Sequence, residues 1–148
     1  MNDAEYIKKA LELARKAAGI GEIPVGAVIV KDGVIIGEGY NLRESHSSAI
    51  SHAEVIAIEE ACRRIGSWRL SGATLYVTLE PCPMCTGAII NSRIDRVVFG
   101  AKDSAAGCCG SLIDLSSYPF NHSFKTDGGV CAEECLAVLK EFFEKRRK

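Results

Sequence analysis

The chain has 148 residues, of which 47% are hydrophobic and 25% charged, and its formal net charge is −1. This length suits a single domain spanning residues 1–148, and the apolar content is enough for a core, which excludes disorder along the whole chain. No apolar run reaches the roughly 18–20 residues of a membrane span, and the N-terminus lacks the apolar segment of a signal peptide. We therefore expect a cytoplasmic protein with no membrane partner, in which only a local basic patch could bind nucleic acid.

The seven cysteines are an odd number. Without a secretion signal they are expected to remain reduced, so a disulfide framework is not predicted. Free thiols in a reducing compartment are buried small hydrophobes, redox groups or metal ligands. Their spacing and their place on the predicted elements must distinguish these roles.

The first half of the chain predicts a helix, a strand hairpin and a second helix, at residues 2–19, 25–30, 34–40 and 52–65. Asn2 with Glu5 three positions on is a variant of the capping box that begins a helix. Asp32-Gly33 is a strong two-residue hairpin turn between β-branched runs. Residues 41–51 are polar and predict a loop, and Gly66 ends the second helix.

The second half predicts alternating strands and helices. Strands are expected at residues 73–79, 96–100 and 123–126, and helices from Pro83 and over residues 131–147. The segment 101–121 is rich in Gly, Ser and Cys, and its length favours a functional loop over a simple connection. This order of elements predicts an α/β fold with one mixed sheet covered by helices on both faces. In such sheets, sites form where strand ends meet helix N-termini.

Two motifs lie at predicted helix starts. The first is His52-Ala53-Glu54, and the second is Pro81-Cys82-Pro83-Met84-Cys85. Within a helix, side chains two residues apart point about 200° apart, so His52 and Glu54 can converge only if His52 lies at the helix mouth. Pro83 suits the first helical position, which makes Cys82 the N-cap and puts Cys85 one turn on. One imidazole and two thiolates form a tetrahedral set that suits Zn²⁺.

The chemistry of these groups points to hydrolysis. Three protein ligands leave a fourth position for water, which is the arrangement of a catalytic zinc. Zinc lowers the pKa of water to about 7, and the carboxylate of Glu54 can accept the proton and pass it to a leaving group.

Other roles for the cysteines remain open at this stage. Cys-x-x-Cys alone is also typical of a redox pair or half of a structural zinc site. A structural zinc could recruit a fourth ligand from Cys108, Cys109, Cys131 or Cys135. Cys131 and Cys135, four apart on a predicted helix, fit packing positions better, and Cys62 lies in an apolar helical stripe of the core.

At these residues the chain resembles the zinc-dependent nucleoside and nucleobase deaminases, whose signature is H-x-E…P-C-x-x-C. Within them it is most similar to the bacterial tRNA-specific adenosine deaminases. The similarity extends over residues 23–27, 37–41, 78–82, 92–94, 96–101, 110–112, 121–122 and 142–143, and over Arg146-Arg147. The chain departs from the family at residues 104–106, Ser-Ala-Ala, where a lysine is often found.

The resemblance implies a three-layer α/β/α, cytidine-deaminase-like fold, a homodimer, and hydrolytic conversion of adenosine to inosine at the wobble position (34) of a tRNA anticodon. It implies that one Zn²⁺ per subunit is bound by His52, Cys82 and Cys85, with Glu54 as catalytic proton shuttle. The substrate contacts that it implies are Asn41, Ala53, Asp103 and Asn121. An Asn bidentate to an adenine edge also makes independent chemical sense.

The C-terminal segment predicts an RNA-binding surface. Residues 140–148 carry five basic and two acidic side chains, an excess of +3 next to two aromatic residues. Basic and aromatic side chains together are typical of contacts to single-stranded RNA. The predicted contacts to the anticodon stem-loop are Phe142, Phe143, Arg146 and Arg147. A solvated basic helix end is the alternative interpretation.

Two other functions compete with this one. A deaminase of a free guanine, cytosine or adenosine-type substrate would not need the basic segment and would act quickly on the small molecule. A zinc-stabilised RNA-binding or redox module would have a fully protein-ligated zinc or an oxidisable Cys82–Cys85 pair and would release no ammonia.

Overall fold

The computed structural model describes residues 1–146. Its elements are α1 (Asp3–Gly19), β1 (Gly26–Lys31), β2 (Val34–Tyr40), α2 (Ala53–Ile65), β3 (Thr74–Leu79), α3 (Pro83–Ser92), β4 (Arg96–Ala101), β5 (Lys125–Asp127) and α4 (Ala132–Arg146). Every helix and strand predicted from the sequence is present, with ends that differ by one or two residues. No helix in residues 1–146 is long and apolar enough to cross a membrane.

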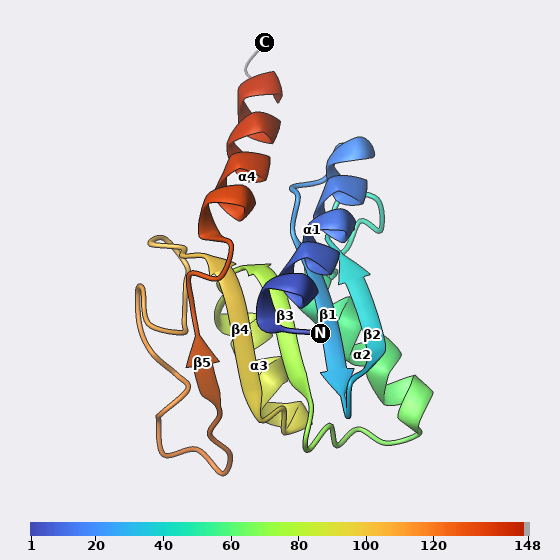
Figure 1. The fold of residues 1–148 in the computed structure, drawn as a ribbon, viewed down its shortest axis with the longest axis vertical. Helices are drawn as coiled ribbons and strands as arrows, with labels where there is room; N and C mark the ends of the chain where they lie inside the picture. The colour runs from blue at the N-terminus through green and yellow to red at the C-terminus, as the bar shows by residue number, and fades with distance from the viewer. Residues whose placement is uncertain (147–148) are drawn as a thin grey trace.

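The five strands form one mixed sheet in the order β2-β1-β3-β4-β5 (Figure 1). β1 pairs antiparallel with both β2 and β3, whereas β3, β4 and β5 are parallel. The parallel pairing follows from the crossover connections that leave β3 and β4, because such strands cannot be joined by a tight turn. This confirms the predicted α/β class and the mixed sheet.

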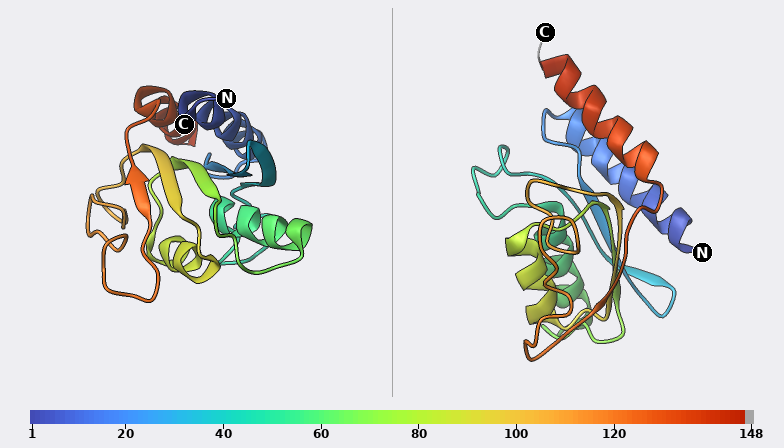
Figure 2. Two further views of the ribbon diagram at one scale, coloured as in Figure 1. Left: turned by 60° about the horizontal axis from the view of Figure 1, so that its bottom comes forward. Right: turned by 90° about the vertical axis from the view of Figure 1, so that its left-hand side faces the viewer.

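The sheet is the middle of three layers. α1 and α4 lie on one face and α2 and α3 on the other (Figure 2). Each face has its own apolar core, one built around Ile7, Leu11 and Val98, the other around Ile29, Leu75 and Ile89. Both faces of β1 and β3 are therefore buried, which explains their nearly continuous apolar sequence.

Local signals in the sequence explain the element ends. The Asn2 side chain accepts a hydrogen bond from the Glu5 N–H at 2.9 Å, as the capping pattern predicts. Asp32 and Gly33 both have positive φ, 52° and 75°, which is the twist a two-residue hairpin needs. Gly66 ends α2 in the left-handed conformation.

A cluster of ion pairs and hydrogen bonds links four elements at the end of the sheet where β4 starts. Arg96 donates to both carboxylate oxygens of Asp3, at 3.0 and 2.7 Å, and also to Asp127 at 2.8 Å. Tyr76 donates to Asp3 as well, at 2.9 Å. The hydrogen bonds from Arg96 hold the pKa of Asp3 below its usual value despite partial burial. The cluster thus joins the start of α1 to β3, β4 and β5.

α2 packs directly on the backbone of β2 because two positions of this strand lack a side chain. A Cβ at Gly39 would overlap the carbonyl oxygen of Ala53, and one at Gly37 would overlap that of Ala57. The first turn of α2 therefore contacts the sheet more closely than any side chain would allow. This contact fixes the height of the residues that begin α2.

Gly39→Ala should consequently destabilise the protein by about 2 kcal/mol or more, since the added methyl group meets backbone that cannot move aside. Urea denaturation with a constant m-value measures this difference. Gly19→Ala is the matched control: a Cβ there meets nothing within 4 Å, so the variant should be as stable as the parent or slightly more. Equal effects at both positions would contradict the close-packing explanation.

Candidate active site

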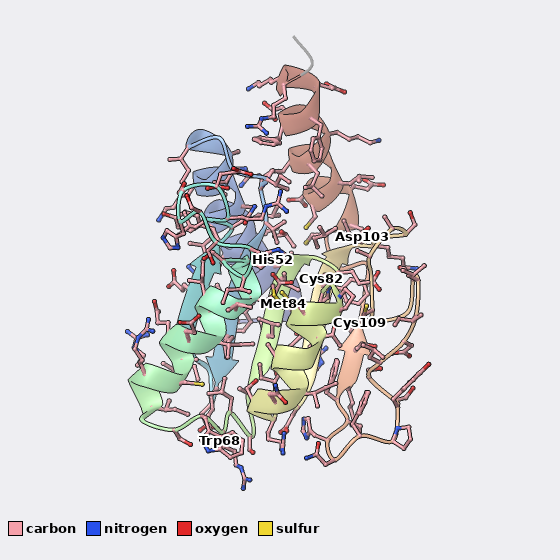
Figure 3. The ribbon with its side chains drawn as sticks, turned by 180° about the vertical axis from the view of Figure 1, so that it is seen from behind. His52, Trp68, Cys82, Met84, Asp103 and Cys109 are labelled. Carbon is pink, nitrogen blue, oxygen red and sulfur yellow. The ribbon has the colours of Figure 1, made fainter. Side chains whose placement is uncertain are left out.

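The three predicted metal ligands converge between the starts of α2 and α3. His52 is the N-cap residue of α2 and Cys82 that of α3, both with extended backbone, and Pro83 is the first residue of α3. Neither N-cap side chain makes a capping hydrogen bond. Figure 3 shows His52 and Cys82 side by side near the middle of the molecule, with Trp68 at the bottom, past the other end of α2. Cys85 is fully buried one turn into α3.

The distances among these groups fit a tetrahedral zinc. Nδ1 of His52 lies 3.7 Å from the Cys82 sulfur and 3.6 Å from the Cys85 sulfur. A tetrahedron with zinc–sulfur bonds of about 2.3 Å and zinc–nitrogen bonds of about 2.0–2.1 Å has nitrogen–sulfur edges of about 3.6 Å. All three ligand atoms lie within 4.8 Å of one another. The donor set therefore fits Zn²⁺ in both chemistry and spacing.

Cys82 has an unusually low pKa for a cysteine. The hydrogen bond from the Cys85 thiol, aided by one from His52, lowers the pKa of Cys82 to about 4. That thiolate in turn raises the pKa of His52 and, by accepting the proton of Cys85, raises the pKa of the Cys85 thiol. Cys82 is thus held ready as a thiolate ligand, as expected for a thiol at a helix N-terminus.

Glu54 lies beside this cluster in the first turn of α2, and its side chain is only 4% exposed. Desolvation raises the pKa of its carboxyl group to about 7, although a hydrogen bond from its own backbone N–H and the nearby His52 oppose the shift. Glu54 is not one of the converging ligands. Its carboxyl group can therefore accept and release a proton near neutral pH, which is what a general acid–base group needs.

The remaining cysteines do not complete a four-ligand site. Within residues 1–146, the converging ligand group consists of His52, Cys82 and Cys85 alone. Cys108 and Cys109 are buried, and burial raises the pKa of both thiols. Cys135 packs in the core on the other face of the sheet. Cys131 lies just before α4, has positive φ and is half-buried. Cys62 is also half-buried and packs at the edge of the core on the opposite face of the sheet.

A cavity of about 200 Å³ opens directly over the cluster. Six of the residues that line it were predicted for the site from the sequence: Asn41, His52, Ala53, Glu54, Cys82 and Asp103. Ala53 is the first residue of α2, so its backbone N–H has no acceptor within the helix. The helix start therefore presents a free donor toward the cavity.

Asn41 is buried and its amide is fixed in orientation. Its Nδ2 donates to the Ile23 carbonyl at 3.2 Å, and its Oδ1 accepts from the Arg43 N–H at 3.2 Å. A side-chain amide has two donor hydrogens and two acceptor lone pairs. One of each remains available, which is the pair that a nucleobase edge can bind.

The structure separates Asn121 from the other predicted contacts. Asn121 is exposed and is not among the cavity-lining residues. Its neighbour His122 is hydrogen-bonded to the Ile94 carbonyl at 2.7 Å, near the start of β4, whereas the cavity lies past the ends of β3 and β4. Asp103 does line the cavity, but its Oδ1 is engaged by the N–H groups of Ala105 and Ala106.

Some lining residues were not predicted from the sequence. Arg43 lies in the polar loop after β2, where no periodicity marks it, and Ile23 and Leu79 form apolar walls. Two buried carboxylates hold the loops beside the cavity. Glu22 accepts from Glu44 and Ser45, and Glu80 accepts from the segment that follows β4. Both residues could have been identified in the sequence as a carboxylate within an apolar stretch.

A groove of about 730 Å³ continues from the cavity toward α4. It shares Ile23, Leu79 and Asp103 with the cavity, and α4 contributes the half-exposed ring of Phe143. Lys102 and Lys140 also line it. Residues 104–106 carry no positive charge, but Lys102, just before Asp103, does line this groove.

The structure places Phe142 away from the groove. Its ring is 8% exposed and lies against the end of α1, where it shares a hollow with Ala18 and Gly19. Adjacent helical residues point about 100° apart, and of these two only Phe143 lines the groove. Arg146 stacks on Phe142 with 4.9 Å between its guanidinium carbon and the ring centre, and also donates to the Gly21 carbonyl. Arg147 lies outside the described residues.

Comparisons with known proteins agree with a deaminase site. Residues 1–147 match the family described as MafB19-like deaminase. A tRNA-specific adenosine deaminase of Bacillus subtilis (strain 168) is 51% identical, with 99% of this chain and 91% of the relative covered. A structure from a study of A-to-I editing by tRNA:A34 deaminases at the wobble position of transfer RNA has a TM-score of 0.87 and 38% identity, over 91% of this chain and 99% of that one. A guanine deaminase from Bacillus subtilis has a TM-score of 0.66 and 31% identity, over 100% and 96%.

The two neighbouring phenylalanines should respond differently to truncation. Phe142→Ala removes a buried ring and should cost about 3 kcal/mol of unfolding free energy, whereas Phe143→Ala should cost less than about 1 kcal/mol. Chemical denaturation of both variants measures the difference. Equal losses would contradict the assignment of Phe142 to the packing between α4 and α1.

Proposed function

Because this chain belongs to the tRNA-specific adenosine deaminases, we infer that it converts adenosine to inosine at the wobble position of a tRNA anticodon. The reaction is hydrolytic: water adds to C6 of the adenine ring and ammonia leaves. The observation that carries this inference to individual residues is the buried carboxyl group of Glu54 beside the His52, Cys82 and Cys85 cluster, at the base of the cavity.

We propose that His52, Cys82 and Cys85 hold one Zn²⁺ per chain. The support is the zinc dependence of the family and the nitrogen–sulfur distances of 3.6–3.7 Å, which match a tetrahedral site. When bound, zinc supplies a Lewis acid that lowers the pKa of water to about 7. The cavity, with its walls of Ile23 and Leu79, limits the access of other solvent to the reacting atoms.

Glu54 is the proposed proton shuttle. Its carboxylate is placed to accept a proton from the attacking water and to deliver it to the leaving nitrogen, so that ammonia departs as a neutral molecule. Burial keeps the pKa of this group near the working pH, and both transfers therefore need little driving force. The close contact of α2 with Gly39 fixes the side chain in place.

The base is proposed to be held by Asn41 and by the start of α2. The free donor and acceptor of the Asn41 amide suit a purine edge, and the backbone N–H of Ala53 offers a further donor. Asp103 contributes to the wall of the cavity. Asn121 lies apart from the cavity, and we include no contact from it in the proposed site.

Phe143 and the lysines of the groove are proposed to contact the RNA around the target nucleotide. Phe143 is exposed on the groove that continues from the cavity, and Lys102 and Lys140 offer positive charge there. An anticodon loop is single-stranded, so its bases can leave the stack at low cost and stack on an aromatic side chain. Arg146 remains a proposed phosphate contact at the end of α4, where its side chain is exposed.

Three predictions from the sequence remain proposals. The homodimer is supported only by the resemblance to the family. A cytoplasmic location is supported by the tRNA substrate named for the relatives. A single deaminase domain over residues 1–148 is supported by the family match over residues 1–147.

Ammonia release tests the function directly. The protein should deaminate an anticodon stem-loop carrying adenosine at the wobble position and act at least about 100-fold more slowly on free adenosine or guanine. Glu54→Gln should retain its fold but lose activity by about 10²–10⁴-fold, because the amide cannot accept the proton. Fast turnover of free guanine would instead place the chain with small-molecule deaminases such as the guanine deaminase that it also resembles.

Metal analysis tests the ligand set. Purified protein should hold about one zinc per chain, with one nitrogen, two sulfur and one light oxygen neighbour in X-ray absorption. Cys82→Ser should lose the metal, whereas Cys135→Ser, on the other face of the sheet, should keep it. Three or four sulfur neighbours would exclude the open site.

A further inference from the structure

Glu80 is a buried carboxylate at the end of β3 with an unusual set of partners. Its side chain is 2% exposed and accepts four hydrogen bonds. The donors are the N–H groups of Asp103, Cys109 and Ser111, at 3.0–3.1 Å, and the hydroxyl group of Ser111, at 2.5 Å. All four donors come from one segment, residues 103–111.

Glu80 is held without a cation. No salt bridge joins it to a basic side chain anywhere in residues 1–146, and the four donors are neutral groups. Burial raises the pKa of this carboxyl group, but the hydrogen bonds from Ser111, Asp103 and Cys109 outweigh burial and hold the pKa below its ordinary value. Glu80 therefore stays a carboxylate, and its four hydrogen bonds fasten one segment of the chain.

The fit around the carboxylate is close. A Cβ at Gly107 would overlap the Glu80 carboxyl group, so the segment can wrap the carboxylate only with glycine at this position. The Gly107 N–H donates to the Asp103 carbonyl at 2.8 Å, and the Cys108 N–H donates to the Pro81 carbonyl at 2.9 Å. The segment is thus bound both to Glu80 and to the residue before the Cys82 ligand.

The same segment forms one wall of the active-site cavity. Asp103 and Ala106 line the cavity, and Asp103 with Ser104 continues into the groove toward α4. Glu80 lies behind this wall and also reaches the cavity lining. The four hydrogen bonds to the Glu80 carboxylate therefore fix the position of this wall relative to Asn41, which follows β2, and Glu54 in α2.

We propose that Glu80 is a positioning residue that holds segment 103–111 as the wall against which the substrate nucleotide binds. The inference rests on the proposed function, since it assigns the wall to that substrate. Glu80 acts mainly on KM, because the wall contacts the bound nucleotide, whereas His52 and Glu54 are placed by α2 and Cys85 by α3.

The test is Glu80→Gln, which replaces one acceptor oxygen by an NH₂ group that faces N–H donors. We expect KM for the anticodon stem-loop to rise at least about tenfold, while kcat falls less than about threefold and zinc content is unchanged. Amide hydrogen exchange should accelerate at Cys109 and Ser111 but not in the core of β3. Ser111→Ala, which removes one donor and leaves the carboxylate, should act in the same direction with a smaller effect.

Asp3→Asn is the matched control, because Asp3 is also a carboxylate with several hydrogen bonds but lies at the far end of the sheet. It should lower stability with no change in KM. A Glu80→Gln variant that is only less stable, with KM unchanged, would overturn the proposal, and so would a fall in kcat alone. If Glu80→Gln does not fold, an unchanged KM in Ser111→Ala overturns it equally. Absence of ammonia release by the parent protein would instead reject the proposed function itself.

Discussion

The contact between α2 and β2 is the constraint on which the site depends. Gly37 and Gly39 allow the helix backbone to rest on the strand backbone, so the first turn of α2 has one possible height above the sheet. That height brings His52 level with the sulfur atoms at the start of α3 and directs Glu54 into the cavity. The chemistry is therefore set by backbone packing, in which missing side chains matter as much as present ones.

The elements and the cluster of His52, Cys82 and Cys85 could be predicted from the sequence because each depends on short-range patterns. Asp32-Gly33 specifies a hairpin by its own conformational preferences, and Pro83 specifies a helix start that makes Cys82 the N-cap. The two motifs lie 30 residues apart, and their convergence was predicted because each lies at the start of a helix. Local stereochemistry thus accounts for the fold class and for the convergence of His52, Cys82 and Cys85.

Other features depend on contacts between distant segments and could not be predicted. Whether Phe142 or Phe143 faces the groove depends on how α4 packs against α1, and both rings look alike in a basic helix end. The partners of Glu80 lie 23–31 residues away in a segment without periodicity. Asn121 was assigned by resemblance alone, and the path of the long loop carries it away from the cavity.

The N-cap positions of α2 and α3 carry a cost in stability. Ser, Thr, Asp or Asn at an N-cap stabilises a helix by about 1 kcal/mol through a side-chain hydrogen bond, and neither His52 nor Cys82 makes one. Both side chains are turned toward the cavity instead. Selection for thermostability would therefore favour replacing these two residues, whereas selection for catalytic turnover opposes it. At these two helix starts, stability and activity require different sequences.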